Sequence, residues 1–290
     1  MNYWDMNTVR SLIFAAGRTA LEYFDFPSTE HKADDSLVTA ADRKIEAFFR
    51  DALTAGEGKP GAGDASFIGE ETSHTMSETD IAAALHGSTW VVDPIDGTAP
   101  YANHLPTWGI SIGYVDDGVL TRGALFVPRT GELLISDNDG TVLLFETSRD
   151  PHSWDDSAGK SFSAEEAPYR SSGMISLPQE IANRASFRGR NPMQANGSAV
   201  YSVVQMILGG YLSYVARIKL WDLAGAVPLL WSLGFRMEFT DGRLLDRAVT
   251  TENWILDPSN PRCWKSTDLL FLARSAETIA YVRDNYEVTR

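Results

Sequence analysis

The chain has 290 residues, of which 43% are hydrophobic and 11% aromatic, and this composition excludes wholesale disorder because it can build a substantial core. Its 25 Lys and Arg residues against 39 Asp and Glu residues give a formal net charge of −14, which argues against broad electrostatic capture of nucleic acid or of an anionic membrane. An anionic substrate remains compatible with this charge, because bound cations can invert the local sign of a site.

The single cysteine, Cys263, can form neither an intrachain disulfide nor a thiolate zinc site, which indicates a reducing cytoplasm. No run of about 18 apolar residues suggests a membrane-spanning helix. The first residues, MNYWDMNTVR, lack the basic and apolar stretches of a signal peptide. We therefore expect a soluble, cytoplasmic protein that binds neither membrane nor nucleic acid.

The first half of the chain begins with helical patterns and continues with strand patterns. Apolar spacing predicts a helix over residues 5–25 and a second helix after Thr39. The apolar stripe of that second helix consists of Ile45, Phe48, Phe49 and Leu53. Composition predicts a loop over residues 56–63. Short β-like runs follow, separated in several places by Asp-Gly turns that favour antiparallel hairpins, at 66–68, 89–92, 110–115, 119–127, 132–136 and 142–145.

The polar segment 147–172 predicts a surface excursion between two halves of one compact unit, residues 1–146 and 147–290. Beyond this segment, the apolar patterns predict strands over 174–177, 211–218 and 235–239 and helices over 198–208 and 222–233. Runs of strands beside segregated helices favour a layered α+β architecture over a strict βαβ repeat.

The most informative stretch is WVVDPIDGTAPY, residues 90–101. A buried strand is expected to end at Asp93, and the proline after it predicts a turn that could aim Asp93 and Asp96 at one point. Gly97 lets the backbone approach a ligand, and Thr98 can cap a helix whose free amides would bind phosphate. The arrangement suggests a metal that bridges protein and phosphoryl group. An ordinary Asp-Gly turn is the alternative for this motif taken alone.

Further acids stand at similar positions elsewhere in the chain. Glu70 and Glu71 directly follow a β-like run, Asp222 lies within an apolar run, and Asp42 lies at the start of a predicted helix. Each alone could be a solvated loop acid, an N-cap or a first-turn acid. A carboxylate in so apolar a setting as that of Asp222 is costly to bury unless it meets a cation. Together these acids favour a metal centre.

The motifs GEE, DPIDGT and WDLAGA, with LVTAAD upstream, resemble those of the inositol monophosphatase family of magnesium-dependent, lithium-sensitive phosphatases, over roughly residues 8–245. The resemblance implies a layered αβαβα sandwich of the sugar-phosphatase type and a homodimer. It also implies a phosphoric monoester hydrolase that uses two or three Mg²⁺ ions. The substrate would be a small polyol, sugar or related metabolite phosphate.

Carried over position by position, the resemblance implies a complete set of site residues. The catalytic residues would be Asp42, Glu70 and Thr98, the metal ligands Glu70, Asp93, Ile95 (through its carbonyl), Asp96 and Asp222, and the phosphate-binding residues Gly97 and Thr98. Asp42 and Thr98 match the pair that orients the attacking water, and Asp93 matches the ligand that bridges two metals. Glu71 has no settled role.

The chemistry also follows from the residue types. Magnesium prefers hard oxygen ligands and retains several waters, which suits a few carboxylates and a substrate phosphate. Two such cations can bind both the attacking water and the ester oxygen of an in-line displacement. The histidines show no HExxH spacing and the chain has no P-loop, so a P-loop kinase alternative has no support.

The segment before the WD motif is expected to select the substrate. Seven residues before Asp222, inositol-hydrolysing members of the family carry a glutamate, whereas this chain has Val215, which disfavours myo-inositol phosphate itself. Arg217 and Lys219 could bind a second anionic group on the substrate or could lie on a solvated strand edge. Weaker candidates for substrate contacts are Lys32, Arg188 and Arg190.

Several alternatives remain at this point. The string KADDSLVTAADRKIE also resembles the histidinol-phosphate phosphatase branch of the same superfamily. A nucleotide 3′-phosphatase is a third possibility, although no base-binding feature is evident. A relative that binds metal or ligand without catalysis is the alternative from another class. The presence of every acid in the site favours catalysis.

Overall fold

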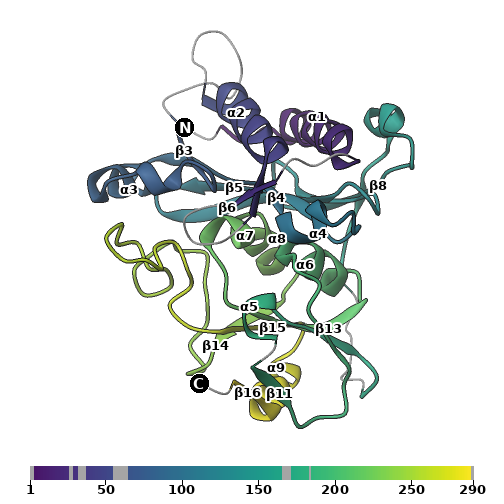
Figure 1. The fold of residues 1–290 in the computed structure, drawn as a ribbon, viewed down its shortest axis with the longest axis vertical. Helices are drawn as coiled ribbons and strands as arrows, with labels where there is room; N and C mark the ends of the chain where they lie inside the picture. Colours follow the sequence, from purple (N-terminus) through teal and green to yellow (C-terminus); the bar gives the residue numbers. More distant parts are fainter. Residues whose placement is uncertain are drawn as a thin grey trace.

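The computed structural model describes residues 3–25, 29–31, 37–54, 65–164, 171–182 and 184–288. Within these ranges, helices and sheets stack in five layers, in the order helix, sheet, helix, sheet, helix (Figure 1). The expected α+β class and αβαβα sandwich are therefore confirmed. No helix in these ranges combines the length and the apolar character needed to cross a membrane.

The first helical layer covers one face of the larger sheet. It contains α1 (Met6–Phe24) and α2 (Ala40–Thr54), with the small hairpin β1 (Thr29–His31) and β2 (Leu37–Thr39) before α2. Both helices were predicted. Phe48, however, is 37% exposed, so it does not belong to the buried stripe of α2. The predicted loop 56–63 lies outside the described residues.

The larger sheet follows the predicted β-like runs closely. Its strand order is β3 (Ser66–Gly69), β4 (Ser88–Asp96), β5 (Gly109–Asp116), β6 (Val119–Val127), β7 (Glu132–Ser136), β8 (Val142–Glu146) and β9 (Lys160–Ser161). β3 is parallel to β4, and the other neighbouring strands are antiparallel, as the hairpin turns indicated. The segment after residue 146 is only partly an excursion. It contains the 3₁₀ helix η2 (Pro151–Asp156), whose Trp154 is buried in the core, and β9 extends the sheet.

The smaller sheet carries the outermost helix. Its strand order is β12 (Met193–Gln194), β10 (Met174–Ser176), β13 (Tyr211–Ala216), β15 (Leu270–Ala273) and β14 (Arg236–Phe239). α9 (Ala276–Asn285) packs on its outer face, and β11 (Ala185–Phe187) pairs with β16 (Tyr286–Val288) beside it. β10, β13 and β14 match predicted strands, whereas β15 and α9 were not predicted. The shorter elements are the 3₁₀ helix η1 (Ser73–Thr75), α3 (Glu78–Leu85), α4 (Thr98–Ala102) and α5 (Gln179–Ala182).

The middle layer contains α6 (Ala199–Ile207), α7 (Leu220–Ala224) and α8 (Ala226–Ser232). A single helix over 222–233 was predicted, but the chain bends at Gly225 into α7 and α8. The reason lies in the larger sheet. The Ser111 hydroxyl donates to the Trp221 carbonyl at 2.8 Å and accepts from the Gly225 amide at 3.2 Å. The sheet thus replaces hydrogen bonds that a continuous helix would make.

Small residues on β5 and β6 let this middle layer approach the sheet. A Cβ atom at Gly113 would meet Ala224, and one at Gly123 would collide with the carbonyl oxygen of Gly225. The backbone of the α7–α8 bend therefore lies directly on the sheet. This contact positions α7, which carries Asp222, against the ends of the central strands.

We expect Gly123→Ala to lower the free energy of unfolding by roughly 1–3 kcal/mol or more, because the new methyl group forces two backbone segments apart. Urea denaturation measures the change. Gly87→Ala is the matched control, since its Cβ would have only the Ala83 carbonyl nearby, at 3.8 Å, and it should change stability by less than about 1 kcal/mol. Equal effects of the two substitutions would contradict the close approach described above.

Candidate metal and phosphate site

The carboxylates of Asp93 and Asp96 come from the end of β4. The strand does not turn at Pro94 as predicted; it continues to Asp96 through a bulge, with a register shift against β5 between Asp93 and Asp96. Proline is tolerated at a bulge because the local ladder is already interrupted there. One Asp93 oxygen accepts a 3.1 Å hydrogen bond from the Ile95 amide. The bulge thus re-aims the strand end so that both carboxylates face one cavity.

Asp96 also anchors the start of α6. Its Oδ2 accepts hydrogen bonds from the Ser198 hydroxyl and, at 2.6 Å, from the Val200 amide. These donors favour the charged carboxylate, but desolvation outweighs them and raises the pKa of Asp96 to about 6. Ser198 was not predicted as a site residue, since only the fold brings α6 to the end of β4.

Asp222 completes a cluster of three aspartates. One oxygen from each of Asp93, Asp96 and Asp222 lies within 4.8 Å of the others. Asp222 is the third residue of the first turn of α7 and not its N-cap; its Oδ2 accepts from the Lys219 amide at 3.0 Å. Desolvation and repulsion from Asp96 and Glu70 raise the pKa of Asp222 to about 8. Burial, with repulsion from Glu70 and the other two aspartates, raises the pKa of Asp93 well above its ordinary value.

A second acidic group lies beside the first. Asp42, Glu70 and Glu71 also bring one carboxylate oxygen each within 4.8 Å of one another. Asp42 is fully buried at the start of α2, where its Oδ2 accepts from the amide of Thr39 at 2.9 Å and from the Thr39 hydroxyl. Its burial raises the pKa of Asp42 to about 7 despite these hydrogen bonds.

Thr98 connects the two acidic groups. Its hydroxyl oxygen lies 3.3 Å from Asp42 Oδ1 and 3.2 Å from the carbonyl oxygen of Ile95. The residue that caps the short helix α4 is Gly97, with φ +90°, and Thr98 is the first helical residue, which corrects the predicted cap. A Cβ at Gly97 would lie 2.9 Å from the Ser198 Cβ, so both the space and the backbone angle require glycine.

These groups open into a cavity of about 540 Å³. Its lining contains most of the predicted site residues: Glu70, Asp93, Ile95, Asp96, Gly97, Thr98, Arg217, Lys219 and Asp222. It also contains six residues that were not predicted, three with polar or charged side chains (Gln179, Glu180 and Lys265) and three others (Ala99, Gly197 and Ile218). Asp42 does not line it directly but reaches it through Thr98. An all-oxygen donor set of this kind suits Mg²⁺ or another hard divalent cation.

The structure does not bring every predicted substrate contact to the cavity. The Val215 side chain is fully buried in the core between β13 and α9, so it does not reach the lining. Arg188 pairs with Glu287 beside β16, and Arg190 is exposed and lines neither cavity described here. Lys32 lies outside the described residues.

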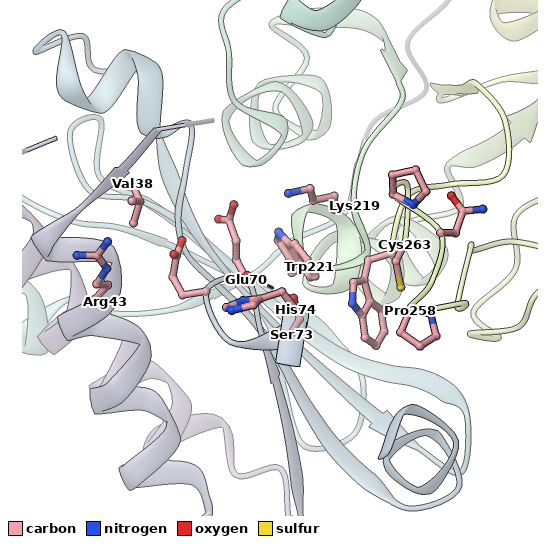
Figure 2. Close-up of a pocket in the computed structure, with 13 residues that line it drawn as sticks. Val38, Arg43, Glu70, Ser73, His74, Lys219, Trp221, Pro258 and Cys263 are labelled. Atoms are coloured by element: carbon pink, nitrogen blue, oxygen red, sulfur yellow. Dashed lines mark hydrogen bonds between the residues drawn. The ribbon is translucent and has the colours of Figure 1, made fainter. Parts of the chain in front are cut away.

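A second cavity of about 510 Å³ adjoins the first and shares Glu70 and Lys219 with it. Figure 2 shows Arg43 and Trp221 on either side of Glu70, with Pro258 and Cys263 beyond Trp221. Glu71 also lines this second cavity. The long segment between β14 and β15 therefore forms one of its walls.

Glu46 is a buried acid that the sequence reasoning missed. It lies one helical turn after Asp42 on the same face of α2, directly beneath the turn that carries Glu70 and Glu71. Its carboxylate accepts from the Glu71 amide at 2.6 Å, from the Thr72 hydroxyl at 2.7 Å and from Arg50 at 2.8 Å. The i, i+4 spacing of two acids on the apolar face was the available signal. Glu46 positions the turn that presents Glu70 to the cavity.

Comparisons with known proteins agree with this geometry. The model of the inositol monophosphatase family matches residues 5–280. A histidinol-phosphatase of Chlorobaculum parvum is 31% identical over 131 residues, 44% of this chain and 46% of the relative. An inositol-1-monophosphatase of Rhizobium meliloti is 29% identical over 144 residues, 48% of this chain and 49% of the relative. Each match thus spans about half the length of the curated relative.

Solved structures support the fold over the whole chain. An IMPase/NADP phosphatase complexed with Mg²⁺ and phosphate superposes with a TM-score of 0.68 at 16% identity, and the match covers 97% of both chains. At this identity the likeness concerns the fold alone.

We expect Glu46→Ala to weaken Mg²⁺ binding by about tenfold, because the Glu70–Thr72 turn loses its acceptor, and to lower the free energy of unfolding by roughly 1–3 kcal/mol. Isothermal titration calorimetry measures the Mg²⁺ affinity, and urea denaturation measures the free energy of unfolding. Glu252→Ala, at an exposed acid outside both cavities, is the control and should change neither quantity. Unchanged Mg²⁺ affinity in a folded Glu46→Ala variant would refute the positioning role.

Without bound cation, the stability of the protein should depend on pH through the raised pKa values. The ordinary aspartate pKa is 3.8, and Asp96, Asp42 and Asp222 rise to about 6, 7 and 8. The folded chain thus binds more protons than the unfolded chain, and the resulting stability is complete below pH 3.8 and is lost as pH rises to about 8. Metal competes with these protons.

We therefore expect the melting temperature in chelator to fall between pH 5 and pH 8, and the increase caused by Mg²⁺ to be larger at pH 8 than at pH 6. Calorimetric melting scans at several pH values, each with chelator or with Mg²⁺, provide the measurement. A Mg²⁺ effect that is greatest at the lowest pH would contradict the assignment.

Proposed function

Because this chain belongs to the inositol monophosphatase family, whose members are phosphatases, we propose that it is a Mg²⁺-dependent phosphomonoesterase for a small polyol, sugar or related metabolite phosphate. The observation that carries the proposal is the convergence of three aspartates beside the backbone amides that begin α4. Like charges at such close range in a poorly solvated place are strongly stabilised by a bound cation. Free amides at a helix start are suited to phosphate oxygens.

The residues present fit Mg²⁺ by their chemistry. Asp93, Asp96 and Asp222, with Glu70 and the Ile95 carbonyl, offer hard oxygen ligands in one cavity. The related IMPase/NADP phosphatase structure that holds Mg²⁺ and phosphate supports this choice of metal. Bound there, two or three ions would neutralise the phosphate and lower the pKa of a water.

The chain's own groups would orient the attacking water. The Thr98 hydroxyl donates toward Asp42, which leaves the lone pairs of its oxygen available to a water in the cavity. A pKa of about 7 allows Asp42 to take up a proton near neutral pH. Gly97 and Thr98 would bind the phosphate through their amides, and the glycine keeps this approach open.

The substrate's alcohol would occupy the rest of the cavity. Its volume of about 540 Å³ suits a metabolite of sugar size. Arg217 and Lys219 line this part and would contact the alcohol, whereas Val215 would act through packing only. A histidinol-phosphate phosphatase is the second candidate, which the 31% identity to the Chlorobaculum parvum relative favours.

A substrate panel tests the proposal. Phosphate release would be measured from inositol 1-phosphate, fructose 1,6-bisphosphate, histidinol phosphate, glycerol 2-phosphate and adenosine 3′,5′-bisphosphate. Each ester would be assayed with Mg²⁺, with chelator, and with Mg²⁺ plus lithium. Turnover that requires Mg²⁺ supports the proposal, and inhibition by lithium supports the family mechanism. Turnover in chelator, or none by folded protein in Mg²⁺, would overturn it.

Two further properties belong to the same proposal. The family resemblance supports a homodimer, and the single cysteine supports a cytoplasmic location. Sedimentation analysis and fractionation of cells test these two points independently of activity.

We expect Asp93→Asn to reduce kcat/KM by at least about 100-fold, because the site loses a bridging ligand, while the metal-free fold is retained or gains stability as repulsion is relieved. Steady-state kinetics in Mg²⁺ and calorimetric melting in chelator are the measurements. Asp156→Asn, at an exposed acid on η2, is the control and should retain full activity. Near wild-type turnover of Asp93→Asn would show that the metal assignment is wrong.

A further inference from the structure

The catalytic cavity also carries three basic side chains. Arg217 and Lys219 line it from the segment between β13 and α7, and Lys265 lines it from the long segment between β14 and β15. Lys219 and Lys265 are direct backbone partners in an isolated antiparallel bridge, so these two lysines start from adjacent points. The result is three cationic side chains on the lining of a cavity in a chain of net charge −14.

Backbone contacts hold Lys265 at this place. The Leu220 amide donates to the Trp264 carbonyl at 2.8 Å, and the Ser266 amide donates to the Ile218 carbonyl at 2.9 Å. Between them, Trp264 adopts a φ of +71°, which is an unfavourable backbone angle for a bulky side chain. Such strain persists only where the surroundings enforce it. The position of Lys265 is therefore built into the fold and is not that of a freely mobile surface lysine.

The three cations differ in the acids they already face. Lys219 lies close enough to Asp222 to oppose part of the rise in the pKa of Asp222. The ammonium nitrogen of Lys219 lies 5.2 Å from the centre of the Trp221 ring (Figure 2). Lys265 pairs with Glu180 at 2.9 Å. Within the described ranges, Arg217 forms no ion pair. Neither Arg217 nor Lys265 pairs with the aspartate cluster. Both are thus placed to bind a further anion when metal and phosphate occupy that cluster.

From this arrangement we infer that the substrate is a phosphate monoester whose alcohol part carries a second anionic group, a carboxylate or another phosphate, bound by Arg217 and Lys265. This inference rests on the proposed function. The transferred phosphate would lie at α4 and the metals, so it does not need these side chains. Arginine binds carboxylate and phosphate groups in a bidentate manner, and a lysine that lines the same cavity adds a point charge.

Glu180 competes for the same lysine. Its side chain is 45% exposed and that of Lys265 is 25% exposed, so the ion pair is screened by solvent and is weak enough for a substrate anion to displace it. Glu180 also repels an anion in the cavity. Removal of its charge should therefore improve binding of a doubly anionic substrate, whereas removal of the charge of Arg217 or Lys265 should weaken it.

Two matched pairs of esters test the inference on the whole protein. Glycerol 2-phosphate and 2-phosphoglycerate differ by one carboxylate, and fructose 1-phosphate and fructose 1,6-bisphosphate differ by one phosphate. Assays would hold free Mg²⁺ at saturation, because the doubly anionic esters also bind Mg²⁺. We expect kcat/KM to favour the doubly anionic member of at least one pair by about tenfold or more, and this preference to shrink at high salt.

Variants identify the residues responsible. Arg217→Ala and Lys265→Ala should each reduce the preference by about tenfold, mainly through KM of the doubly anionic ester, and Glu180→Gln should increase it. Lys160→Ala, at an exposed lysine on β9, is the control and should leave the preference unchanged. A gain in one variant and losses in two others cannot arise from general damage to the fold.

The possible outcomes distinguish a failure of this inference from a failure of the proposed phosphatase function. A preference in the first pair assigns a carboxylate, and a preference in the second pair assigns a phosphate; both support the inference. Mg²⁺-dependent hydrolysis of all four esters without preference, or a preference that Arg217→Ala and Lys265→Ala leave intact, overturns it while the phosphatase function stands. Absence of hydrolysis from every ester and from the wider panel overturns the proposed function, and the inference falls with it.

Discussion

The mutual repulsion of Asp93, Asp96 and Asp222 dominates the energetics of the site. Each carboxylate is held within 4.8 Å of the others in a poorly solvated place, where like charges interact strongly. Side-chain movement that would relieve this repulsion is opposed by backbone hydrogen bonds, since Asp93 accepts from Ile95 in its own strand, Asp222 accepts from Lys219 at the start of its own helix, and Asp96 accepts from Val200 in α6. The free energy stored in the cluster is released when protons or cations bind. The same feature thus lowers stability at neutral pH and would raise affinity for a divalent cation.

The larger sheet makes this crowded arrangement rigid. Gly113 and Gly123 remove side chains where α7 and α8 meet the sheet, and the Ser111 hydroxyl replaces helix hydrogen bonds at the bend. A bulkier surface at these positions would move α7 outward and would carry Asp222 away from the strand end. On the other face, the buried carboxylate of Glu46 holds the turn that presents Glu70. Packing on both faces of one sheet therefore sets the geometry of the site.

Much of the fold and of the acidic site could be predicted from the sequence, because the strand patterns and the acidic motifs lie within short segments of the chain. Strand patterns with Asp-Gly turns predicted the hairpins of the larger sheet, and the spacing of short acidic motifs indicated the residues that converge. What could not be predicted depends on contacts between distant segments. The bend at Gly225 follows from the sheet beneath it, and the place of Lys265 follows from a backbone bridge to Lys219. Val215 was placed by analogy at the substrate, whereas its strand turns that side chain toward α9.

The hydrogen bond from Ser111 to the Trp221 carbonyl joins residues 110 positions apart in the chain, and it has a consequence for biosynthesis. The strand that carries Asp93 and Asp96, β4, is made early, but the helix that carries Asp222 emerges from the ribosome much later. Closure of so long a loop is slow compared with formation of local hairpins. A growing chain therefore holds only part of the proposed ligand set, with Asp93 and Asp96 but not Asp222. Metal capture at this site would in this way be coupled to completion of the fold, so the nascent protein would not sequester cellular cations in a half-formed site.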